Sequence, residues 1–308
     1  MRYFLIFFLT ISTFAENRLD YLYRFPQKGE SVLTYSLYWS IDEMEFDNRS
    51  AGVEEFFEVD RSVLVAGLEY RYAFSDKFLA AFSTHAEIAD FETHLENELD
   101  EETPEQSPFG IYDPAIELRY RFIDLNEVFF DLSTKVVWGA TNSGKTPLSK
   151  TVSPFDGQDY YQVSAIAGID FNTFYLLSYV GAIFYNGGLN QFEFGNESLK
   201  AEDSYQVAIG FQAQIDLSKH LKASLGISFL SADTFSLSGQ TQNVNVEKST
   251  QQNYFLKFDY LKYENRIGIL TFKVNQRIDR YDLQVDNSDL YVADNSYLDF
   301  IFQIEKWF

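Results

Sequence analysis

Residues 203–219 read DSYQVAIGFQAQIDLSK, and apolar side chains occur there at every second position. Polar or small side chains occupy the positions between them. A period of two is typical of a β-strand with one apolar and one polar face. The alternation is longer than the roughly 5–6 residues of a common globular strand, and it matches the ~9–11 residues of a tilted membrane-spanning strand. The stretch therefore predicts one strand of a transmembrane β-barrel.

The same alternation recurs along the whole chain and predicts about twelve strands, an even number that places both termini at one rim of the barrel. In the segment 174–185 both faces are apolar, so the alternation does not tell which face points inward. The predicted strands are 31–41, 63–74, 78–89, 115–122, 127–138, 161–171, 174–185, 205–217, 221–230, 253–261, 266–278 and 297–308.

The connections between these segments alternate in length. The short ones are 75–77, 123–126, 172–173, 218–220 and 262–265, and the long ones are 42–62, 90–114, 139–160, 186–204, 231–252 and 279–296. Short turns at one rim and long loops at the other are typical of outer-membrane barrels. We therefore expect an all-β fold, a single antiparallel up-and-down transmembrane β-barrel over residues 31–308, with short periplasmic turns and long extracellular loops.

The N-terminus indicates export. Arg2 precedes a short apolar run, and Thr13 and Ala15 are the small residues of a cleavage site, so residues 1–15 are predicted to be a cleaved signal peptide. Residues 16–30 would then form a short periplasmic segment, too short for a substantial plug. The chain of 308 residues has no cysteine, which excludes disulfides and thiolate metal sites. Its net charge of −22 disfavours nucleic acid as a partner.

The C-terminus, QIEKWF, ends in Phe308 after an alternating apolar strand. This ending resembles the C-terminal assembly signature of Gram-negative outer-membrane proteins. It implies the barrel assembly machinery as a partner, together with outer-membrane lipid and lipopolysaccharide. The predicted location is the bacterial outer membrane.

One motif points elsewhere. Residues 139–146, GATNSGKT, fit the phosphate-binding loop G-x-x-x-x-G-K-[ST] at every fixed position. Such a loop must open a helix whose backbone N–H groups face the phosphates. Pro147, Pro154 and Gly157 follow instead, without apolar residues at helical spacing, and proline inside a helix costs about 3 kcal/mol. We therefore interpret the motif as an extracellular loop and expect no nucleotide and no cofactor.

The central part of the chain resembles a known family. It reads FGIYDPAIELRYRF at 109–122, DLSTKVVWGATNSGKTP at 131–147 and DYYQVSAIAGIDFN at 159–172. These stretches resemble the outer-membrane proteins of the phenol meta-degradation family, although Trp138-Gly139 stands where Pro-Thr-Gly is usual. The resemblance covers residues 109–186. It implies a barrel that passes small, often hydrophobic molecules and carries no catalytic residues.

The polar partners of the apolar positions are the candidates for lining the lumen. They would either ring a water-filled pore and set its selectivity, or pair with one another and fill a closed barrel. The sequence leaves both alternatives open. The candidates are Glu69, Arg71, His85, Glu87, Glu117, Arg119, Arg121, Asp131, Lys135, Gln212, Lys257, Asp259, Lys273 and Arg277.

The sequence offers candidates for two further kinds of site, a cation site and a hydrolytic site. The acidic stretches 42–60 and 90–106 are expected to be solvated loops, with divalent cations as an alternative, although no stretch matches an EF-hand. A lipid hydrolase needs a serine beside an oriented histidine, and only His85 near Ser83 offers that pair, on the predicted inner face. His94 falls in a predicted loop and His220 in a predicted turn. We expect no enzyme.

Two functions remain as hypotheses. The first is an outer-membrane channel or transporter for small molecules, with hydrophobic or cationic solutes as its cargo. The second is a structural or adhesive surface protein with a plugged lumen and acidic loops.

Overall fold

The structure, a computed structural model, describes most of the chain as antiparallel sheet. The described residues contain no helix that is long and apolar enough to cross a membrane. The predicted cleavage site, the GATNSGKT motif and residues 96–106 of the acidic stretch lie outside the described residues. The described residues are 25–48, 56–95, 110–125, 127–138, 159–171, 174–186, 191–194, 197–238, 243–261, 267–285 and 289–308.

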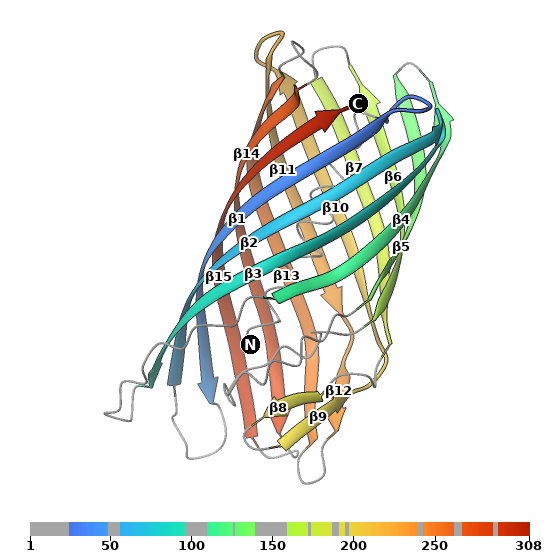
Figure 1. The fold of residues 1–308 in the computed structure, drawn as a ribbon. Coiled ribbons are helices and arrows are strands. Elements are labelled where there is room, and N and C mark those ends of the chain that lie inside the picture. Colours follow the sequence, from blue (N-terminus) through green and yellow to red (C-terminus); the bar gives the residue numbers. More distant parts are fainter. Residues whose placement is uncertain are drawn as a thin grey trace.

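Twelve strands form a closed antiparallel ring, which confirms the predicted fold class (Figure 1). Each strand pairs with its neighbour along the chain, and the pairing of β1 with β15 closes the ring. The ring strands are β1 (Ser31–Asn48), β2 (Phe56–Ser75), β3 (Phe78–Leu95), β4 (Gly110–Asp124), β5 (Val128–Val137), β6 (Tyr160–Asp170), β7 (Phe174–Tyr185), β10 (Ser204–Asp216), β11 (Leu221–Ala232), β13 (Asn243–Leu261), β14 (Ile267–Val285) and β15 (Asp289–Trp307).

The closing seam joins the two ends of the ring sequence. Strands β1 and β15 stay in register from Val32↔Trp307 to Asn48↔Tyr291. Ser31 and Phe308 exchange two backbone hydrogen bonds, at 3.0 and 3.3 Å. The terminal Phe308 therefore completes the first strand's ladder at the short-turn rim. Its predicted role in assembly remains a prediction.

The outer face of the ring is apolar. Large hydrophobic side chains such as Leu68, Leu118, Ile209 and Phe302 are exposed there, as expected where lipid replaces water. Exposed aromatic side chains lie at both ends of this apolar belt, which is where interfacial girdles of membrane proteins occur. They are Phe74, Phe122, Phe171 and Phe308 near the short turns, and Trp39, Trp138, Tyr161 and Tyr205 near the opposite end.

Strand β7 has its faces settled by the structure. Tyr175, Leu177 and Tyr179 point inward and are buried, whereas Leu176 and Val180 are exposed on the outer face. Both faces are apolar because the inner wall at this strand is itself aromatic and aliphatic. The period of two therefore could not tell which face of this strand points inward.

Several predicted loops are wrong, because the strands continue into them. Six neighbouring strands, β13, β14, β15, β1, β2 and β3, are 18–20 residues long, whereas the other six have 10–15. The predicted loop 279–296 is mostly strand, with Val285 paired to Asp289. Outside the membrane both faces of a strand are hydrated, so the alternation stops although the backbone ladder continues. One half of the wall is therefore taller (Figure 1).

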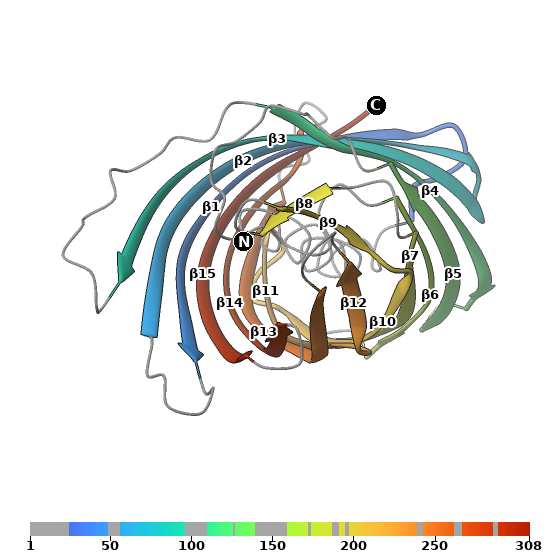
Figure 2. The ribbon, with the colours of Figure 1, turned by 90° about the horizontal axis from the view of Figure 1, so that it is seen from below.

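Three short strands lie within two of the predicted loops. They are β8 (Gln191–Phe194), β9 (Glu197–Ala201) and β12 (Phe235–Ser238). β12 pairs with residues 243–246 of β13 and also with β9. β9 in turn pairs with β8. Seen from the end opposite the C-terminus, β8 and β9 lie at the mouth of the ring, and β1 to β3 reach beyond it (Figure 2).

A charge on the outer face should destabilise the barrel. Ile209 lies near the middle of β10, faces outward and pairs with Val180 and Phe229. We expect Ile209→Arg to lower the free energy of unfolding in lipid vesicles by about 2–4 kcal/mol, because a midplane arginine leaves water for hydrocarbon. Urea-induced unfolding followed by tryptophan fluorescence measures this. Glu43→Arg, at an exposed position beyond the apolar belt, is the control. Equal losses in both variants would contradict this placement of the membrane.

Candidate functional site

The inner face of the ring collects almost all of the predicted lumen residues. Glu69, His85 and Glu117 lie on this face and are partly buried. Glu87 lies on β3 opposite Val65 and Gly110, but its side chain is outside the described set. The buried members are Arg71, Arg119, Arg121, Asp131, Lys135, Gln212, Lys257, Asp259, Lys273 and Arg277.

A single carboxylate holds two arginines near the short-turn rim. Asp131 of β5 is fully buried and lies across from Arg121 of β4 in the register. Its Oδ1 accepts a hydrogen bond from Arg121 Nε at 2.9 Å, and its Oδ2 accepts one from Arg119 Nε at 2.8 Å. Charge-assisted bonds of this kind are the strong ones. The arrangement fixes both guanidinium groups against the wall.

Two aromatic rings cover Arg121. The guanidinium carbon lies 4.5 Å from the ring centre of Phe129 and 4.7 Å from that of Phe25. Phe25 belongs to the predicted periplasmic segment 16–30, so this segment reaches the inner wall. Backbone hydrogen bonds attach it to the rim, from Gly29 N to Ala73 O at 2.8 Å. Gly29 has a φ of 86°, a conformation that favours glycine.

Arg71 bridges the closing seam. Its Nη2 donates to Thr34 Oγ1 of β1 at 3.0 Å and to Glu305 Oε1 of β15 at 3.1 Å, and its Nε lies 3.1 Å from Glu69 Oε1. One buried side chain thus connects β2 to both strands of the seam. The predicted lumen residue Glu69 is one of the two carboxylates beside Arg71. Glu305 was not predicted, because apolar and polar residues are mixed on its face of the last strand.

A second charged group lies on β13 and β14. Lys257 Nζ is 2.9 Å from Asp259 Oδ2, and Thr271 Oγ1 donates to Asp259 Oδ1 at 2.6 Å. Lys273 Nζ lies 4.1 Å from the ring centre of Phe255, which packs over Gly226 of β11 so closely that a Cβ there would collide with the ring. The ion pair therefore lies within β13, and Thr271 ties it to β14.

Asp299 is a centre of hydrogen bonds that the sequence analysis missed. It is fully buried on β15 and accepts from Tyr38 OH at 2.5 Å, Ser40 Oγ at 2.8 Å and Asn275 Nδ2 at 2.6 Å. Its position between the outward-facing residues Leu298 and Phe300 is the sequence feature that would have predicted an inward side chain. Asp279 was missed for another reason, since it fell in the predicted loop 279–296.

The opposite side of the inner wall carries no charge over most of its height. On β6, β7 and β10 the buried polar side chains are glutamine, serine and tyrosine. Gln162 Nε2 donates to Tyr179 OH at 2.5 Å, and the rings of Tyr160 and Tyr185 lie 5.4 Å apart. The inner face thus has an uncharged, aromatic part on β6, β7 and β10, whereas buried charged residues lie on β2, β4, β5, β11, β13, β14 and β15.

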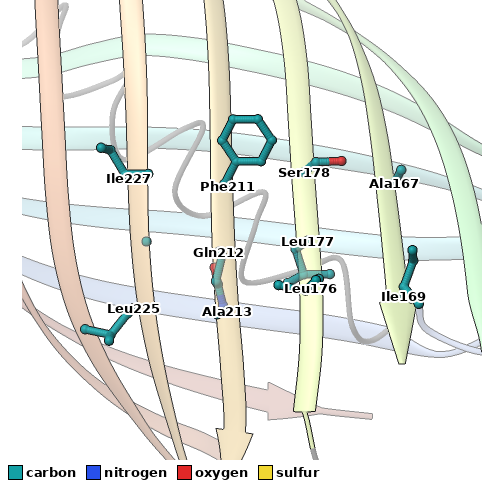
Figure 3. Close-up of a pocket in the computed structure, with 11 residues that line it drawn as sticks. Ala167, Ile169, Leu176, Leu177, Ser178, Phe211, Gln212, Ala213, Leu225 and Ile227 are labelled. Atoms are coloured by element: carbon teal, nitrogen blue, oxygen red, sulfur yellow. The ribbon is translucent and has the colours of Figure 1, made fainter. Parts of the chain in front are cut away.

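An apolar pocket of about 570 Å3 lies on the outer face, over β6, β7, β10 and β11 (Figure 3). Ile169, Leu176 and Leu225 line it and belong to the lipid-facing belt. The ladder beneath it is continuous, with Leu177↔Gln212 and Gln212↔Gly226 paired. The pocket therefore does not open a path through the wall, and small side chains such as Ala167 and Ala213 account for its depth.

The residues considered for hydrolysis do not form a lipid-facing site. Ser83 and His85 lie on the inner face of β3, opposite Glu69 and Gly67 of β2. His94 lies on β3 rather than in a loop, and His220 Nδ1 lies 3.2 Å from the backbone oxygen of Leu261. Within the described ranges no three His, Cys, Asp or Glu side chains cluster as metal ligands would.

Comparisons with known proteins bear on the fold. No protein-family model and no curated protein sequence matches the chain. The crystal structure of an outer membrane channel from Pseudomonas putida F1 superposes with a TM-score of 0.54 at 10% identity, over 92% of this chain and 97% of that one. The likeness supports an outer-membrane barrel fold.

Two other solved structures are less similar. A Pseudomonas aeruginosa FadL homologue has a TM-score of 0.42 at 7% identity, over 91% of this chain and 90% of that one. The outer membrane protease OmpT from Escherichia coli has a TM-score of 0.38 at 7% identity, over 91% and 97%. At these scores neither carries an argument about this chain.

Removing the shared carboxylate should destabilise the barrel strongly. In Asp131→Asn two buried guanidinium groups lose their counter-charge, and breaking a buried pair from one side costs about 3–5 kcal/mol. Unfolding in urea, in lipid vesicles, measures the loss. Asp124→Asn is the matched control, because Asp124 is half exposed and 3.7 Å from Arg121 Nη1, and exposed pairs contribute less than about 1 kcal/mol. A small effect of Asp131→Asn would show that water holds these arginines instead.

Proposed function

We propose that this protein is a channel or transporter that carries small molecules across the bacterial outer membrane. The observation that supports it most directly is the closed ring of twelve strands with an apolar outer face and a polar, charged inner face. A wall of this kind is stable in lipid on one side and presents hydrogen-bonding groups to a solute on the other. The likeness to an outer membrane channel agrees with this function.

We also propose membership of the phenol meta-degradation outer-membrane family. The stretches that carry the resemblance lie on β4, β5 and β6, three consecutive neighbours in the ring. The uncharged, aromatic part of the inner wall lies on β6, β7 and β10. A route for hydrophobic solutes along this part and for cations along the acidic loops would serve the cargo proposed above.

The alternative function is a structural or adhesive surface protein. The paired charges of the inner wall favour it, because Asp131, Asp259 and Asp299 hold their partners in networks that could fill a closed barrel. The taller half of the wall would then be the contact surface.

A non-enzymatic role accompanies both functions. The serine and histidine that a hydrolase would use face inward from β3, away from lipid. We also propose that residues 1–15 are a cleaved signal peptide and that Phe308 takes part in assembly. The proposed partners are lipopolysaccharide, the barrel assembly machinery and a small-molecule solute. Neither a nucleotide nor a nucleic acid is among them.

Export should leave a shortened chain. We expect the protein purified from outer membranes to begin at Glu16, because Thr13 and Ala15 present small side chains to the signal peptidase. Intact-mass spectrometry measures this. A chain that retains residues 1–15 in the membrane would contradict the predicted cleavage.

Conductance tests the channel. We expect the refolded mature chain, residues 16–308, to show discrete openings in a planar bilayer. In a salt gradient its reversal potential should be that of a cation-selective pore, because the strongly negative charge of the protein, −22 for the full chain, concentrates cations at the mouth.

The control is the same protein boiled before reconstitution, which should be silent. Heat-modifiable migration in gels reports whether the refolded barrel is intact. Silence from folded protein would contradict an open aqueous pore and favour the structural alternative.

A further inference from the structure

A second pocket, of about 470 Å3, lies at the rim opposite the short turns. Strands β5 and β7 end at this pocket, with Val137 and Tyr185, and β6 and β10 begin there, with Tyr160 and Ser204. All four strands belong to the lower half of the wall. The volume of the pocket is within the range of small-molecule sites, roughly 300–1,000 Å3. The pocket is therefore large enough for a solute and lies where the wall is low.

Four aromatic side chains of the outer face line this pocket. The rings of Tyr161 and Phe184 stack at 4.8 Å, with an angle of 14° between their planes. Tyr205 OH donates to Asp233 Oδ2 at 3.0 Å, which restrains the Tyr205 ring. Trp138 is the fourth, and it is about half exposed, as are Tyr161 and Tyr205. The face of an aromatic ring attracts cations, and groups of such rings are a known way to bind quaternary ammonium ions.

Carboxylates give the pocket a negative charge. Asp159 and Asp203 line it together with Asn186, whose backbone N donates to Asp159 O at 2.9 Å. Asp203 is exposed and Asp159 partly exposed, so both are open to solvent. None of the described residues that line the pocket is basic. The pocket therefore attracts a cation and repels an anion.

The pocket also adjoins the aromatic part of the inner wall. Tyr160 and Tyr185 are among its lining residues. Their side chains are buried on the inner face, with the two ring centres 5.4 Å apart. The pocket thus lies beside the aromatic rings of both faces, at the edge of the wall. A solute held there is next to the proposed route for hydrophobic solutes.

We propose that this pocket binds small quaternary ammonium ions. Trp138, Tyr161 and Tyr205 provide the aromatic surface for the methyl groups, and Asp159 and Asp203 balance the charge. A quaternary ammonium ion has no N–H group, so it needs no hydrogen-bond acceptor among these rings. Free solutes and lipid headgroups both carry this group. The role of the site in uptake rests on the proposed channel function, whereas binding itself does not.

Saturation-transfer NMR of the refolded mature chain in maltoside micelles tests the site. Choline and 3,3-dimethylbutan-1-ol have the same shape and differ in charge, so they are the probes. We expect a saturable signal from the methyl groups of choline, which boiled protein in the same micelles lacks, and much weaker binding of the alcohol. Equal binding of the two probes would show a merely apolar pocket and would overturn the proposal.

Two variants remove the contacts one at a time. Trp138→Leu keeps an apolar side chain and loses the ring, so the Kd for choline should rise about threefold, as for a partly exposed cation–π contact. Asp203→Asn removes one charge and should raise the Kd by a similar factor. Trp39→Leu, at an outer-face tryptophan of β1 with nearly the same exposure, is the control for the first variant. Asp216→Asn, at the other end of β10, is the control for the second.

The controls should bind choline as the wild type does. Unchanged Kd values in Trp138→Leu and Asp203→Asn would overturn the site, and so would losses that are as large in the controls. Heat-modifiable migration reports whether each variant is folded. Should Trp138→Leu fail this check, Tyr205→Leu, which removes another ring of the pocket, replaces it with the same expectation.

Binding and conductance are separate measurements. A barrel that conducts and binds no choline overturns the site and leaves the proposed channel function standing. A barrel that binds choline and does not conduct contradicts the channel function and supports the site.

Vesicles distinguish the two sources of the ammonium group. The choline signal is compared in vesicles of phosphatidylglycerol and of phosphatidylcholine. A signal that disappears only in phosphatidylcholine shows that a lipid headgroup occupies the pocket, and a signal in both assigns the pocket to free solutes. Either result supports the ammonium site, and no signal in either kind of vesicle overturns it.

Discussion

Every backbone N–H and C=O group within hydrocarbon must find its partner inside the protein. A flat sheet cannot meet this condition, because its two edge strands keep a row of open groups. Here the condition is met where β1 and β15 pair along their length, and Ser31 and Phe308 complete the ladder at the rim. The rest of the molecule depends on this closure, since only a closed ring separates a lipid-facing side from an enclosed one.

Closure brings charged residues into a space where they must be neutralised. The wall meets this need with shared acceptors rather than isolated pairs. Asp131 serves two arginines, and Asp299 serves a tyrosine, a serine and an amide. Aromatic rings also cover cations of the wall, as Phe255 does for Lys273 and Phe129 for Arg121.

The period of two was enough to predict the ring, its strand count and the inward position of residues such as Arg119 and Lys257. It failed where the surroundings of a strand change. Beyond the membrane both faces of a strand meet water, so the sequence does not alternate where β14 and β15 extend past the lipid. Asp279 was therefore placed in a predicted loop. On β7 both faces are apolar. Contacts between distant segments, such as Phe25 on Arg121, leave no periodic trace at all.

The seam also determines the order in which such a barrel can be completed. Most neighbouring ring strands are joined by adjacent stretches of chain and can form as local hairpins. The pairing of β1 with β15 instead joins the two ends of the ring sequence, and contacts of such large sequence separation form slowly. Until the last nineteen-residue strand arrives, the growing sheet has two open edges. A chain cut before β15 therefore yields an aggregation-prone sheet rather than a smaller barrel.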